Sequence, residues 1–524
     1  MNPDVNDSAV PVVVVGAGPV GLTAAALLAR YGVACLVLER RDSPYPHPRA
    51  VHLDDEAHRI LARLGAGAAF AAVSRPARGL RLLDPDMRVL AEFRRGTAPG
   101  RHGFPEANLF DQPELERLLL NALARRGEAR LRGDAEVTAI APDGPDAVRV
   151  EYTDRRTGET ASVRADYVLG CDGAGSLTRA SIGASMRDLR FAQRWLVVDV
   201  DTSAPIDAWE GVHQVCDPDR PATYMRVGAR RHRWEFRLAP GETAEDFRDP
   251  DRLHPLIRPW TGELPADRLR LVRAAEYTFR AQTADRWRAG RVFLLGDAAH
   301  LTPPFIGQGL GAGLRDAANL AWKLAGVLEG DFDEDVLDSY QAERLPHART
   351  MIRRAKLVGL AMTEGGRLGN MVRGAVAPAL QRLPGAAGAI IDSETPALRR
   401  SALVRPSGPR RGLAGRLSPN AVTGDGRRLD EVAAGRFAVV VAAPCTGPQR
   451  AAVEGRAERC GAVLVTAEPR SELHAWLRRG RARAAIVRPD GTVLRAGRDP
   501  ARLCAALPAF TAADRGSGSS NPPT

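Results

Sequence analysis

The sequence predicts an α/β protein in which a parallel sheet is interrupted by a mostly antiparallel sheet and followed by a smaller α/β unit. Three observations support this prediction. Residues 12–40 have the pattern of a strand, a glycine loop, a helix and a strand, which is one βαβ unit. Residues 190–285 contain short alternating segments broken by Pro and Gly, as antiparallel strands do. Residues 436–442, 461–465 and 484–488 are short apolar runs with helical patterns between them.

Length and composition are those of a chain with several folded domains. The 524 residues exceed one ordinary domain, and 44% of them are hydrophobic and 26% are charged. No apolar run reaches the roughly 18 residues of a membrane span. The N-terminus lacks the basic and apolar segments of a signal peptide, because its first apolar run leads directly into a glycine loop. We therefore expect a cytoplasmic protein.

The basic charge does not predict a nucleic-acid partner. The net charge is +11, and only Lys323 and Lys356 are lysines, so arginine supplies nearly all of the positive charge. These arginines are spread along the whole chain instead of forming one basic stripe. The cysteines lie at positions 35, 171, 216, 445, 460 and 504. None of them forms a CxxC pair, so neither a metal site nor a disulfide framework is expected.

The first chemical motif is the GxGxxG loop Gly16-Ala17-Gly18-Pro19-Val20-Gly21, which follows a buried strand and opens a helix. Gly16 permits the tight turn, Gly18 lets the backbone approach a diphosphate, and Gly21 lets the helix pack closely on the sheet. Phosphates would then lie at the helix N-terminus, where free N–H groups favour negative charge. The alternative is a glycine turn in another kind of α/β fold.

Glu39 ends the second strand, eighteen residues after Gly21. It is placed to accept hydrogen bonds from the ribose hydroxyls of an adenosine. Arg40 follows it and is included among the expected cofactor contacts. Arg40 and Arg41 could also be interpreted as a clamp for the 2′-phosphate of NADP. A surface position is favoured for them, because Glu39 would repel that phosphate.

Two later segments have the same pattern of a strand that runs into a glycine turn. The first is GCDGAGSLTR at residues 170–179, and the second is GDAAHLTPPFIGQGLGAGLRDA at residues 296–317. Proline and glycine keep the second segment irregular until a helix begins near Leu310. The N-terminus of that helix could stabilise negative charge on a bound cofactor. His300 is expected to support this loop through a structural hydrogen bond, in preference to a catalytic role.

The order and spacing of these three motifs resemble those of the group A flavoprotein monooxygenases, which have the fold of p-hydroxybenzoate hydroxylase. The resemblance covers about residues 11–350, with a further match in the C-terminal part. Within the group, the chain is most similar to 3-(3-hydroxyphenyl)propionate hydroxylase and its relatives. The stretches that carry this likeness are PRAVHLDDEAHRILARLG, WLVVDVD, HQVCDPDRP, RRHRWEFRLAPGET and DAANLAWKL.

The resemblance implies a Rossmann-type FAD-binding domain, an inserted mostly antiparallel β-sheet domain for the substrate, and a C-terminal thioredoxin-like α/β domain. The implied boundaries are 1–185 and 286–397 for the two parts of the FAD-binding domain with its long helices, 186–285 for the substrate sheet, 398–510 for the thioredoxin-like domain and 511–524 for a disordered tail. Cys445 stands alone, so dithiol chemistry is not expected. The C-terminal domain is expected instead to have a role in structure or in subunit contacts, as in a homodimer.

Carried over residue by residue, the resemblance also implies roles toward FAD. Asp297 would hold the ribityl chain, and Asp172 and Arg179 would touch both FAD and the passing nicotinamide nucleotide. Arg49 and Gln112 lie where family members contact the central part of the cofactor. The full expected set is Gly16, Ala17, Gly18, Pro19, Gly21, Glu39, Arg40, Arg49, Gln112, Asp172, Arg179, Gly296, Asp297, Pro304, Gly307, Gly309 and Gly311.

The sequence departs from the family pattern at one position of the last motif. Gly307 and Gly309 would bring main chain to the isoalloxazine edge, but relatives commonly carry Asn where this chain has Gly311. A backbone contact survives that change, whereas a side-chain contact does not.

The implied activity is NAD(P)H-dependent hydroxylation of a phenolic ring. NADH or NADPH, visiting transiently, would reduce a tightly bound, non-covalent FAD, O2 would add to give a C4a-hydroperoxide, and the phenol would attack its distal oxygen. A phenolic acid like 3-(3-hydroxyphenyl)propionate is the expected substrate, and a polycyclic polyketide or another natural product is the alternative. A more distant alternative function is that of a non-catalytic sensor that binds FAD. A halogenase is disfavoured, because Lys323 and Lys356 lie in or beyond the helix after the last motif and no WxWxIP stretch exists.

No motif identifies the residues that activate the phenol. His213, Tyr224 and Tyr277 are candidates, because they lie in the inserted sheet, whose inner face is expected to roof the pocket. A packing or surface role is the alternative for each. The arginines that could pair with a substrate carboxylate are Arg226, Arg230, Arg231 and Arg237.

Overall fold

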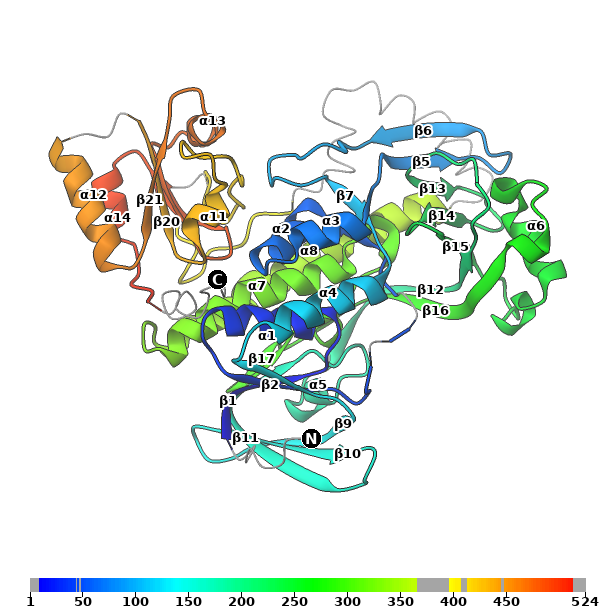
Figure 1. Ribbon diagram of the computed structural model, residues 1–524, viewed down its shortest axis with the longest axis horizontal. Coiled ribbons are helices and arrows are strands. Elements are labelled where there is room, and N and C mark those ends of the chain that lie inside the picture. Colours follow the sequence, from blue (N-terminus) through cyan, green and yellow to red (C-terminus); the bar gives the residue numbers. More distant parts are fainter. Residues whose placement is uncertain are drawn as a thin grey trace, which may run out of the picture.

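A computed structural model of the chain describes residues 9–43, 45–46, 49–364, 395–406, 412–443 and 447–511. Figure 1 shows a central body in which long helices lie over a sheet. A second sheet, partly in green, lies on one side of this body, and a smaller domain in orange and red lies on the other. Among the described helices, none is both long enough and apolar enough to cross a membrane.

The N-terminal sheet belongs to the central body. Its strands are β1 (Ala9–Val15), β2 (Cys35–Leu38), β8 (Ala129–Arg132), β9 (Ala135–Pro142), β10 (Val148–Asp154), β11 (Thr160–Gly170), β17 (Arg288–Ala289) and β18 (Val292–Leu294). The order is β17-β18-β11-β1-β2-β8, and β9 and β10 extend it from β11. β1 runs parallel to both β2 and β11. Its valines at 12–15 are all buried, as expected for a central strand of a parallel sheet.

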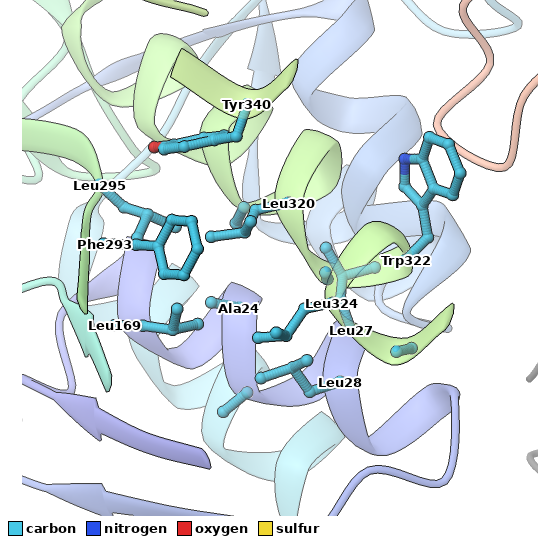
Figure 2. Close-up of a cluster of buried hydrophobic side chains, with 14 of the residues drawn as sticks. Ala24, Leu27, Leu28, Leu169, Phe293, Leu295, Leu320, Trp322, Leu324 and Tyr340 are labelled. Atoms are coloured by element: carbon cyan, nitrogen blue, oxygen red, sulfur yellow. The ribbon is translucent and has the colours of Figure 1, made fainter. Parts of the chain in front are cut away.

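The helices of the central body lie over this sheet or beside it (Figure 1). They are α1 (Pro19–Arg30), α2 (Asp55–Arg63), α3 (Gly67–Val73), α4 (Gln112–Ala124), α5 (Leu177–Ser181), α7 (Gly309–Leu328) and α8 (Asp338–Thr363). Ala24 and Leu28 of α1 lie beside Leu320 and Leu324 of α7, with Phe293 of β18 at the edge of the cluster (Figure 2). The small alanines of α1 let the two helices approach closely, so α7 is buried on most of its circumference.

The second sheet, here called the inserted sheet, consists of β5 (Gly79–Leu83), β6 (Val89–Arg94), β12 (Met186–Asp201), β13 (Val212–Val215), β14 (Ala222–Arg226), β15 (Arg231–Arg237), β16 (Arg270–Ala284) and β19 (His300–Leu301). Its order is β19-β16-β12-β15-β14-β13-β5-β6, and all pairs except the parallel β13–β5 pair are antiparallel. β5 and β6 come from the first 185 residues, so the sheet includes strands that precede the predicted insertion.

The inserted sheet has two different faces. One face, here called the outer face, packs on α6 (Pro250–Thr261) and carries Leu196, Trp234 and Phe236. The other, here called the inner face, looks toward the central body. Cross-strand pairing places Trp195 and Asp199 of β12 on it, because the residues between them point to the outer face. Trp195 contacts Phe305 of the central body at 5.9 Å between ring centroids, which fixes the orientation of the sheet.

Short elements connect these layers. A three-stranded sheet is formed by β3 (His52–Asp54), β7 (Ala107–Leu109) and β4 (Arg75–Pro76). The 3₁₀ turns are η1 (Glu245–Phe247), η2 (Ala266–Arg268), η3 (Gly296–Ala298), η4 (Pro304–Ile306) and η5 (Glu334–Leu337). The third glycine-rich motif runs from η3 through η4 into the first half of α7.

The C-terminal domain has four strands and four helices among its described residues. They are α11 (Leu429–Ala433), β20 (Ala438–Ala442), α12 (Gly447–Arg459), β21 (Val463–Ala467), α13 (Glu472–Arg479), β22 (Ala484–Val487), β23 (Val493–Gly497) and α14 (Pro500–Cys504). From β20 onward the order is βαβαββα, in which β20 and β21 are parallel and β22 and β23 antiparallel. This order is that of a thioredoxin-like unit. The helical stretch predicted to continue to about residue 382 lies outside the described residues from position 365 onward. The predicted tail lies outside them from position 512 onward.

Buried ion pairs join this domain to the central body. Arg59 of α2 donates two hydrogen bonds to Asp430, with N–O distances of 2.7 and 2.6 Å, and Arg63 pairs with the same carboxylate at 2.8 Å. On α7 and α8, Lys323 and Glu343 form an ion pair at 2.9 Å that Arg488 of the C-terminal domain joins at 3.0 Å. The domain is therefore anchored through charged side chains that the fold removes from water.

Candidate active site

The glycine motifs meet at the carboxyl end of the N-terminal sheet. Gly16 has φ +98°, and a Cβ there would lie 2.7 Å from the Cys171 carbonyl oxygen of the middle motif. A Cβ on Gly21 would lie 1.9 Å from the Gly16 carbonyl oxygen, and one on Gly313 would lie 3.1 Å from Cα of Gly296. Only glycine allows these approaches, so the three segments predicted from the sequence converge on one place.

The N-terminus of α1 is open to an anion. Gly18 is its N-cap, and no described residue caps it with a side chain or lies within 4 Å of a Cβ built at Gly18. The first turn contains no acidic residue, so its N–H groups and the helix dipole are available to a diphosphate. Pro19, at the first helical position, has no N–H of its own to satisfy.

Glu39 closes this loop from the end of β2. Its carboxylate accepts hydrogen bonds from the main-chain N–H groups of Ala17 (2.7 Å) and Arg41 (3.1 Å). The half-buried carboxylate is thus held beside the glycine loop, where its remaining lone pairs can accept bonds from ribose hydroxyls. Arg40 is exposed, and its carbonyl accepts a hydrogen bond from Arg155 at 3.2 Å.

The middle motif is tied together by its own polar groups. The Asp172 carboxylate accepts hydrogen bonds from the Ser176 hydroxyl (2.6 Å) and from the N–H and hydroxyl of Thr178 (2.9 and 3.0 Å), so it caps the short helix α5. Arg179 donates to the carbonyls of Ala174 (2.8 Å) and Ala298 (3.1 Å). Arg179 therefore connects the middle motif to the third one. The contacts of Asp172 and Arg179 with a nicotinamide nucleotide stay a prediction.

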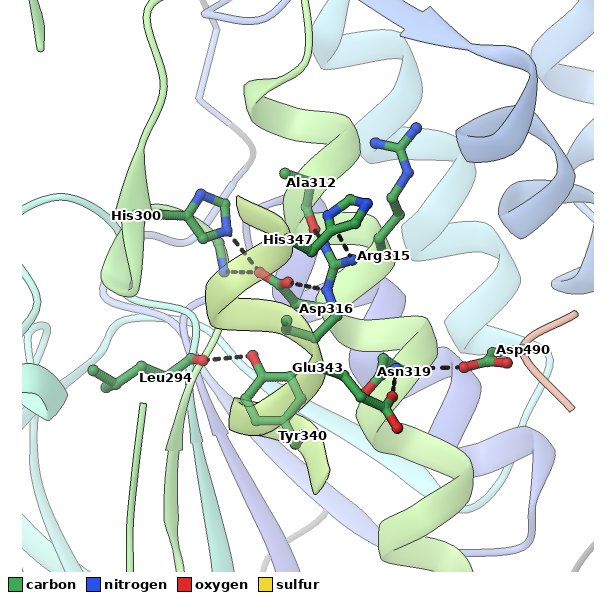
Figure 3. Close-up of polar contacts among 12 residues, drawn as sticks. Leu294, His300, Ala312, Arg315, Asp316, Asn319, Tyr340, Glu343, His347 and Asp490 are labelled. Carbon is green, nitrogen blue, oxygen red and sulfur yellow. Dashed lines mark hydrogen bonds and ion pairs between the residues drawn. The ribbon is translucent and has the colours of Figure 1, made fainter. Parts of the chain in front are cut away.

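The third motif is held by Asp316 of α7. Its carboxylate accepts hydrogen bonds from the Gly296 N–H (3.1 Å) and from Nε2 of His300 (2.8 Å), and it pairs with Arg344 of α8 at 2.8 Å (Figure 3). His300 is fully buried and stacks on Trp287 at 5.2 Å between ring centroids. These contacts are those of the structural role expected for His300.

Asp297 lies in η3, the turn that follows β18. Its side chain reaches solvent, yet desolvation by the surrounding protein raises its pKa above the ordinary value, while His300 and Arg49 act in the opposite direction. A group that is both accessible and walled by protein is placed to meet a ligand. The electrostatic influence of Arg49 also brings two expected cofactor residues, Arg49 and Asp297, into the same neighbourhood.

The GQG loop is fixed from β3 and α2. Gly307 has φ +61°, and its carbonyl accepts a hydrogen bond from Nδ1 of His52 at 3.1 Å. Gln308 donates to Asp54 at 2.8 Å, and Arg315 pairs with both Asp54 and Glu56. No sequence pattern pointed to a role for His52, because only the fold brings β3 to this loop.

His52 is neutral in this position. Burial lowers its pKa to about 4, with Arg95 acting in the same direction. Because a carbonyl only accepts, the His52 proton must lie on Nδ1. The neighbouring helix α7 begins at Gly309 without a side-chain cap from the described residues and without an acid in its first turn. Its positive end is therefore directed at the space beside the loop.

Positions 304 and 311 complete the loop. Pro304 is half-buried at the start of η4. A Cβ at Gly311 would lie 3.0 Å from a guanidinium nitrogen of Arg315, so a larger residue would require that guanidinium to move. Gly311, which stands where relatives commonly carry Asn, is thus close to the Arg315 guanidinium that pairs with Asp54 and Glu56.

The segment that contains Arg49 is held from two sides. The Gln112 side-chain oxygen accepts hydrogen bonds from the N–H groups of Arg49 (3.1 Å) and Ala50 (2.8 Å). Arg233, on the inner face, donates to the Arg49 carbonyl at 3.0 Å and forms a two-bond ion pair with Asp199 at 2.8 and 2.9 Å. Arg233 therefore couples the inserted sheet to the cofactor segment.

The three catalytic candidates of the inserted sheet fall on opposite faces. His213 and Tyr224 lie on the outer face: His213 accepts a hydrogen bond from Trp260 of α6 at 3.2 Å, and Tyr224 belongs to the core with that helix. Burial lowers the pKa of His213 to about 4 and raises that of Tyr224. Tyr277 pairs with Trp195 and lies on the inner face, under the guanidinium of Arg273.

The four candidate arginines each pair with an acidic residue. The pairs are Arg226–Glu210 (3.5 Å), Arg230–Asp201 (3.2 Å), Arg231–Asp111 (2.8 Å) and Arg237–Glu364 (2.9 Å). Among the described residues, no cluster of His, Cys, Asp or Glu is arranged to hold a metal ion.

The site as a whole fits FAD. An uncapped helix N-terminus beside the open position of Gly18 suits the diphosphate, Glu39 suits the adenosine ribose, and the exposed Asp297 lies within the electrostatic influence of Arg49. The second uncapped helix N-terminus, beside Gly307, suits the edge of the flavin ring that carries negative charge when the flavin is reduced.

Comparisons with known proteins agree with this geometry. The family model of the FAD binding domain matches residues 9–355. The chain is 37% identical over 361 residues to the "Probable NADH-specific resorcinol 4-hydroxylase" of Rhodococcus jostii (strain RHA1), which covers 69% of this chain and 67% of that protein. It is 35% identical over 484 residues to the 3-(3-hydroxy-phenyl)propionate/3-hydroxycinnamic acid hydroxylase of Mycobacterium sp. (strain KMS), covering 88% of this chain and 80% of that protein.

Solved structures are similar over nearly the whole chain. The flavin-dependent monooxygenase PieE, in complex with FAD and substrate, has a TM-score of 0.78 and 25% identity, covering 97% of this chain and 99% of its own. Aklavinone-11 hydroxylase with FAD and aklavinone has a TM-score of 0.76 and 26% identity, covering 96% and 99%. This chain therefore belongs to the FAD-dependent aromatic-ring monooxygenases, and it is an enzyme that uses FAD and a nicotinamide reductant.

Proposed function

We propose that this enzyme hydroxylates a small phenol, either resorcinol or a phenolic acid like 3-(3-hydroxyphenyl)propionate, with NADH as reductant and O2 as the oxygen source. The names of relatives at 37% and 35% identity support this substrate class. The observation that carries it is the aromatic wall beside the GQG loop, in which the partly exposed Phe279 and Phe305 pack on the buried Trp195, at 5.5 and 5.9 Å between ring centroids. Such a wall suits a flat aromatic ring.

FAD bound at this site would supply the redox chemistry, with the nicotinamide nucleotide as hydride donor and O2 as the source of the oxygen atom. The protein itself would position the cofactor and the substrate and would exclude water from the site. The N-termini of α1 and α7 would hold the diphosphate and the flavin edge, and Glu39 would hold the ribose. Phe305 and Trp195 exclude water from the side where the substrate ring lies, which favours transfer to the ring over release of hydrogen peroxide.

A second candidate is hydroxylation of a polycyclic natural product. The structural match to aklavinone-11 hydroxylase over 96% of this chain favours it, since the same three-part architecture serves a large substrate there. The dependence on cellular NADH supports a cytoplasmic location. A homodimer stays a prediction that light scattering of the purified protein would check.

The test is a panel of substrates with the purified FAD-loaded enzyme. We expect resorcinol or 3-(3-hydroxyphenyl)propionate to stimulate NADH oxidation, with oxygen uptake and a product one oxygen atom heavier by mass spectrometry. Turnover of polycyclic phenols alone would support the second candidate. Bound FAD without substrate-stimulated NADH oxidation by any phenol would contradict both candidates and favour a sensor.

A further inference from the structure

A carboxylate of the inner face has no partner among the residues that the structure describes. Glu235 of β15 stands opposite Val197 of β12 and Thr223 of β14, so all three share one face of the sheet. Only 8% of Glu235 is exposed, yet it forms no hydrogen bond or ion pair with any described residue. Its polar neighbours are engaged elsewhere, because Asp199 binds Arg233 with both oxygens and the Thr223 hydroxyl donates to Gln214 at 3.0 Å.

The position of Glu235 is next to the proposed aromatic wall. Trp195 lies two residues before Val197 on β12, and residues two apart on a strand point to the same face. Glu235 is therefore a diagonal neighbour of Trp195, at a separation of roughly 7 Å between their backbones. Trp195 in turn contacts Phe305, which precedes Gly307 of the GQG loop by two residues. Glu235 thus lies between Trp195, which contacts the flavin loop, and Arg233, which contacts the cofactor segment at Arg49.

An unpaired carboxylate in this environment destabilises the fold. Desolvation raises the pKa of Glu235 above the ordinary value, Arg233 lowers it, and Asp199 raises it further. The charged groups that surround Glu235 are Asp199 on β12, Arg233 and Arg237 on its own strand, and Glu364 just after α8, which pairs with Arg237. A buried acid without compensation is retained at functional sites more often than elsewhere.

We propose that Glu235 is a catalytic residue that accepts the proton of the substrate's phenolic hydroxyl. This proposal rests on the proposed function. Among the inner-face groups, Asp199 is occupied by Arg233, and Tyr277 carries a phenol that donates more readily than it accepts. Glu235 is the buried carboxylate of β12 and β15 on the inner face whose oxygens accept no hydrogen bond from any described residue.

With Glu235 in this role, every proton of the reaction has a donor and an acceptor. The phenolic hydroxyl gives its proton to the Glu235 carboxylate as a ring carbon forms a bond with one oxygen atom from O2. The ring oxygen becomes a carbonyl for that step. When the attacked carbon loses its hydrogen as a proton, the ring becomes aromatic again and Glu235 returns its proton to the oxygen. NADH supplies two electrons, and NADH and one solvent proton supply two hydrogens, one for the new hydroxyl group and one for the other oxygen atom. That second oxygen leaves as water with the proton released from the ring carbon.

The proposal is tested on the FAD-loaded enzyme with the variants Glu235→Gln and Glu235→Asp. Glu235→Gln should keep FAD and substrate-stimulated NADH oxidation, while product per NADH falls about 100-fold and hydrogen peroxide replaces it. Glu235→Asp should recover part of the coupling. Wild type should lose kcat/KM for hydroxylation as Glu235 becomes protonated toward acid pH, and this acid limb should vanish in Glu235→Gln.

Stability separates catalysis from a structural role. Glu235→Gln removes an uncompensated buried charge, so its Tm should equal or exceed that of wild type. The matched control is Glu276→Gln, which removes a carboxylate of β16 that pairs with Arg194 at 2.7 Å and points away from the inner face; it should keep full coupling.

Two results would overturn the proposal: coupling in Glu235→Gln within threefold of wild type, or a lowered Tm that accompanies the lost activity, which would mean that Glu235 has a structural partner. Failure of the wild-type enzyme to hydroxylate any phenol of the panel would contradict the proposed function itself. Comparing wild type with the variant therefore distinguishes the two failures.

Discussion

The Asp316 carboxylate accepts a hydrogen bond from the main-chain N–H of Gly296 at 3.1 Å, which fastens the GD turn to the long helix α7. The same carboxylate binds His300 and Arg344, so one side chain sets the position of the turn that presents Asp297. Figure 3 shows these groups gathered between α7 and α8. The cofactor cleft is thus shaped by a buried charge that need not touch the cofactor.

We expect Asp316→Asn to weaken FAD binding by at least tenfold and to cost about 3 kcal/mol of stability. The reason is that Arg344 stays buried without its counter-charge and the Gly296 turn loosens. FAD affinity by fluorescence quenching and chemical denaturation would measure the two effects. Asp338→Asn is the control, because Asp338 pairs with Arg288 on the surface. Unchanged FAD affinity in Asp316→Asn would show that the turn holds itself.

Two glycines of the first motif should respond differently to alanine. The Gly18→Ala protein should fold normally, because no described atom lies within 4 Å of the new Cβ, but it should bind FAD at least tenfold more weakly, because the Cβ occupies the diphosphate space. The Gly21→Ala protein should be destabilised by several kcal/mol, since its Cβ would lie 1.9 Å from the Gly16 carbonyl oxygen.

Thermal denaturation without and with FAD separates these two effects. Gly127→Ala is the control, an alanine at another open position that is remote from the cleft in sequence. FAD binding by Gly18→Ala at wild-type strength would contradict a diphosphate site at this loop.

Acid should destabilise the protein through two buried carboxylates. Burial alone would favour their protonated forms, but Arg315 holds the pKa of Asp54 at about 2, and Arg488 with Lys323 holds that of Glu343 at about 2. The ordinary values are 3.8 and 4.5, so their stabilisation is complete above about pH 5 and is lost as the pH falls toward 2.

Once both are protonated, Asp54 should account for about 2 kcal/mol and Glu343 for about 3 kcal/mol of this loss. Urea denaturation followed by circular dichroism between pH 6 and pH 3 would measure it. The double variant Asp54→Asn, Glu343→Gln should be less stable at pH 6 and show a shallower decline with acid. A decline as steep as that of wild type would assign the acid sensitivity to other groups.

The C-terminal domain should depend on Asp430. Asp430→Asn leaves Arg59 and Arg63 buried between the domains without their shared carboxylate, at a cost of about 3 kcal/mol. We expect a lower midpoint in urea denaturation and earlier cleavage in limited proteolysis. Asp425→Asn is the control, because that exposed aspartate pairs only locally with Arg427. Equal denaturation midpoints in the two variants would mean that apolar packing alone holds the domain.

The family and the α/β fold class could be predicted from the sequence, and the comparisons confirm both. The reason is that the signals are local. Four valines before Gly16 predict a central strand of a parallel sheet, and a glycine turn followed by a helix predicts a diphosphate site wherever it occurs. The fold then brings Gly16, Cys171 and Gly296 together, as the order of the motifs predicted.

The tertiary structure alone decided which side chains face the cleft. Alternation along β15 predicts that Trp234 and Glu235 point in opposite directions, but it does not tell which face meets the flavin. The docking of α6 settles this, and it removes His213 and Tyr224 to the outer face while Glu235 stays on the inner one. Sheet register and helix docking are set by contacts between residues far apart in the chain, which no local pattern records.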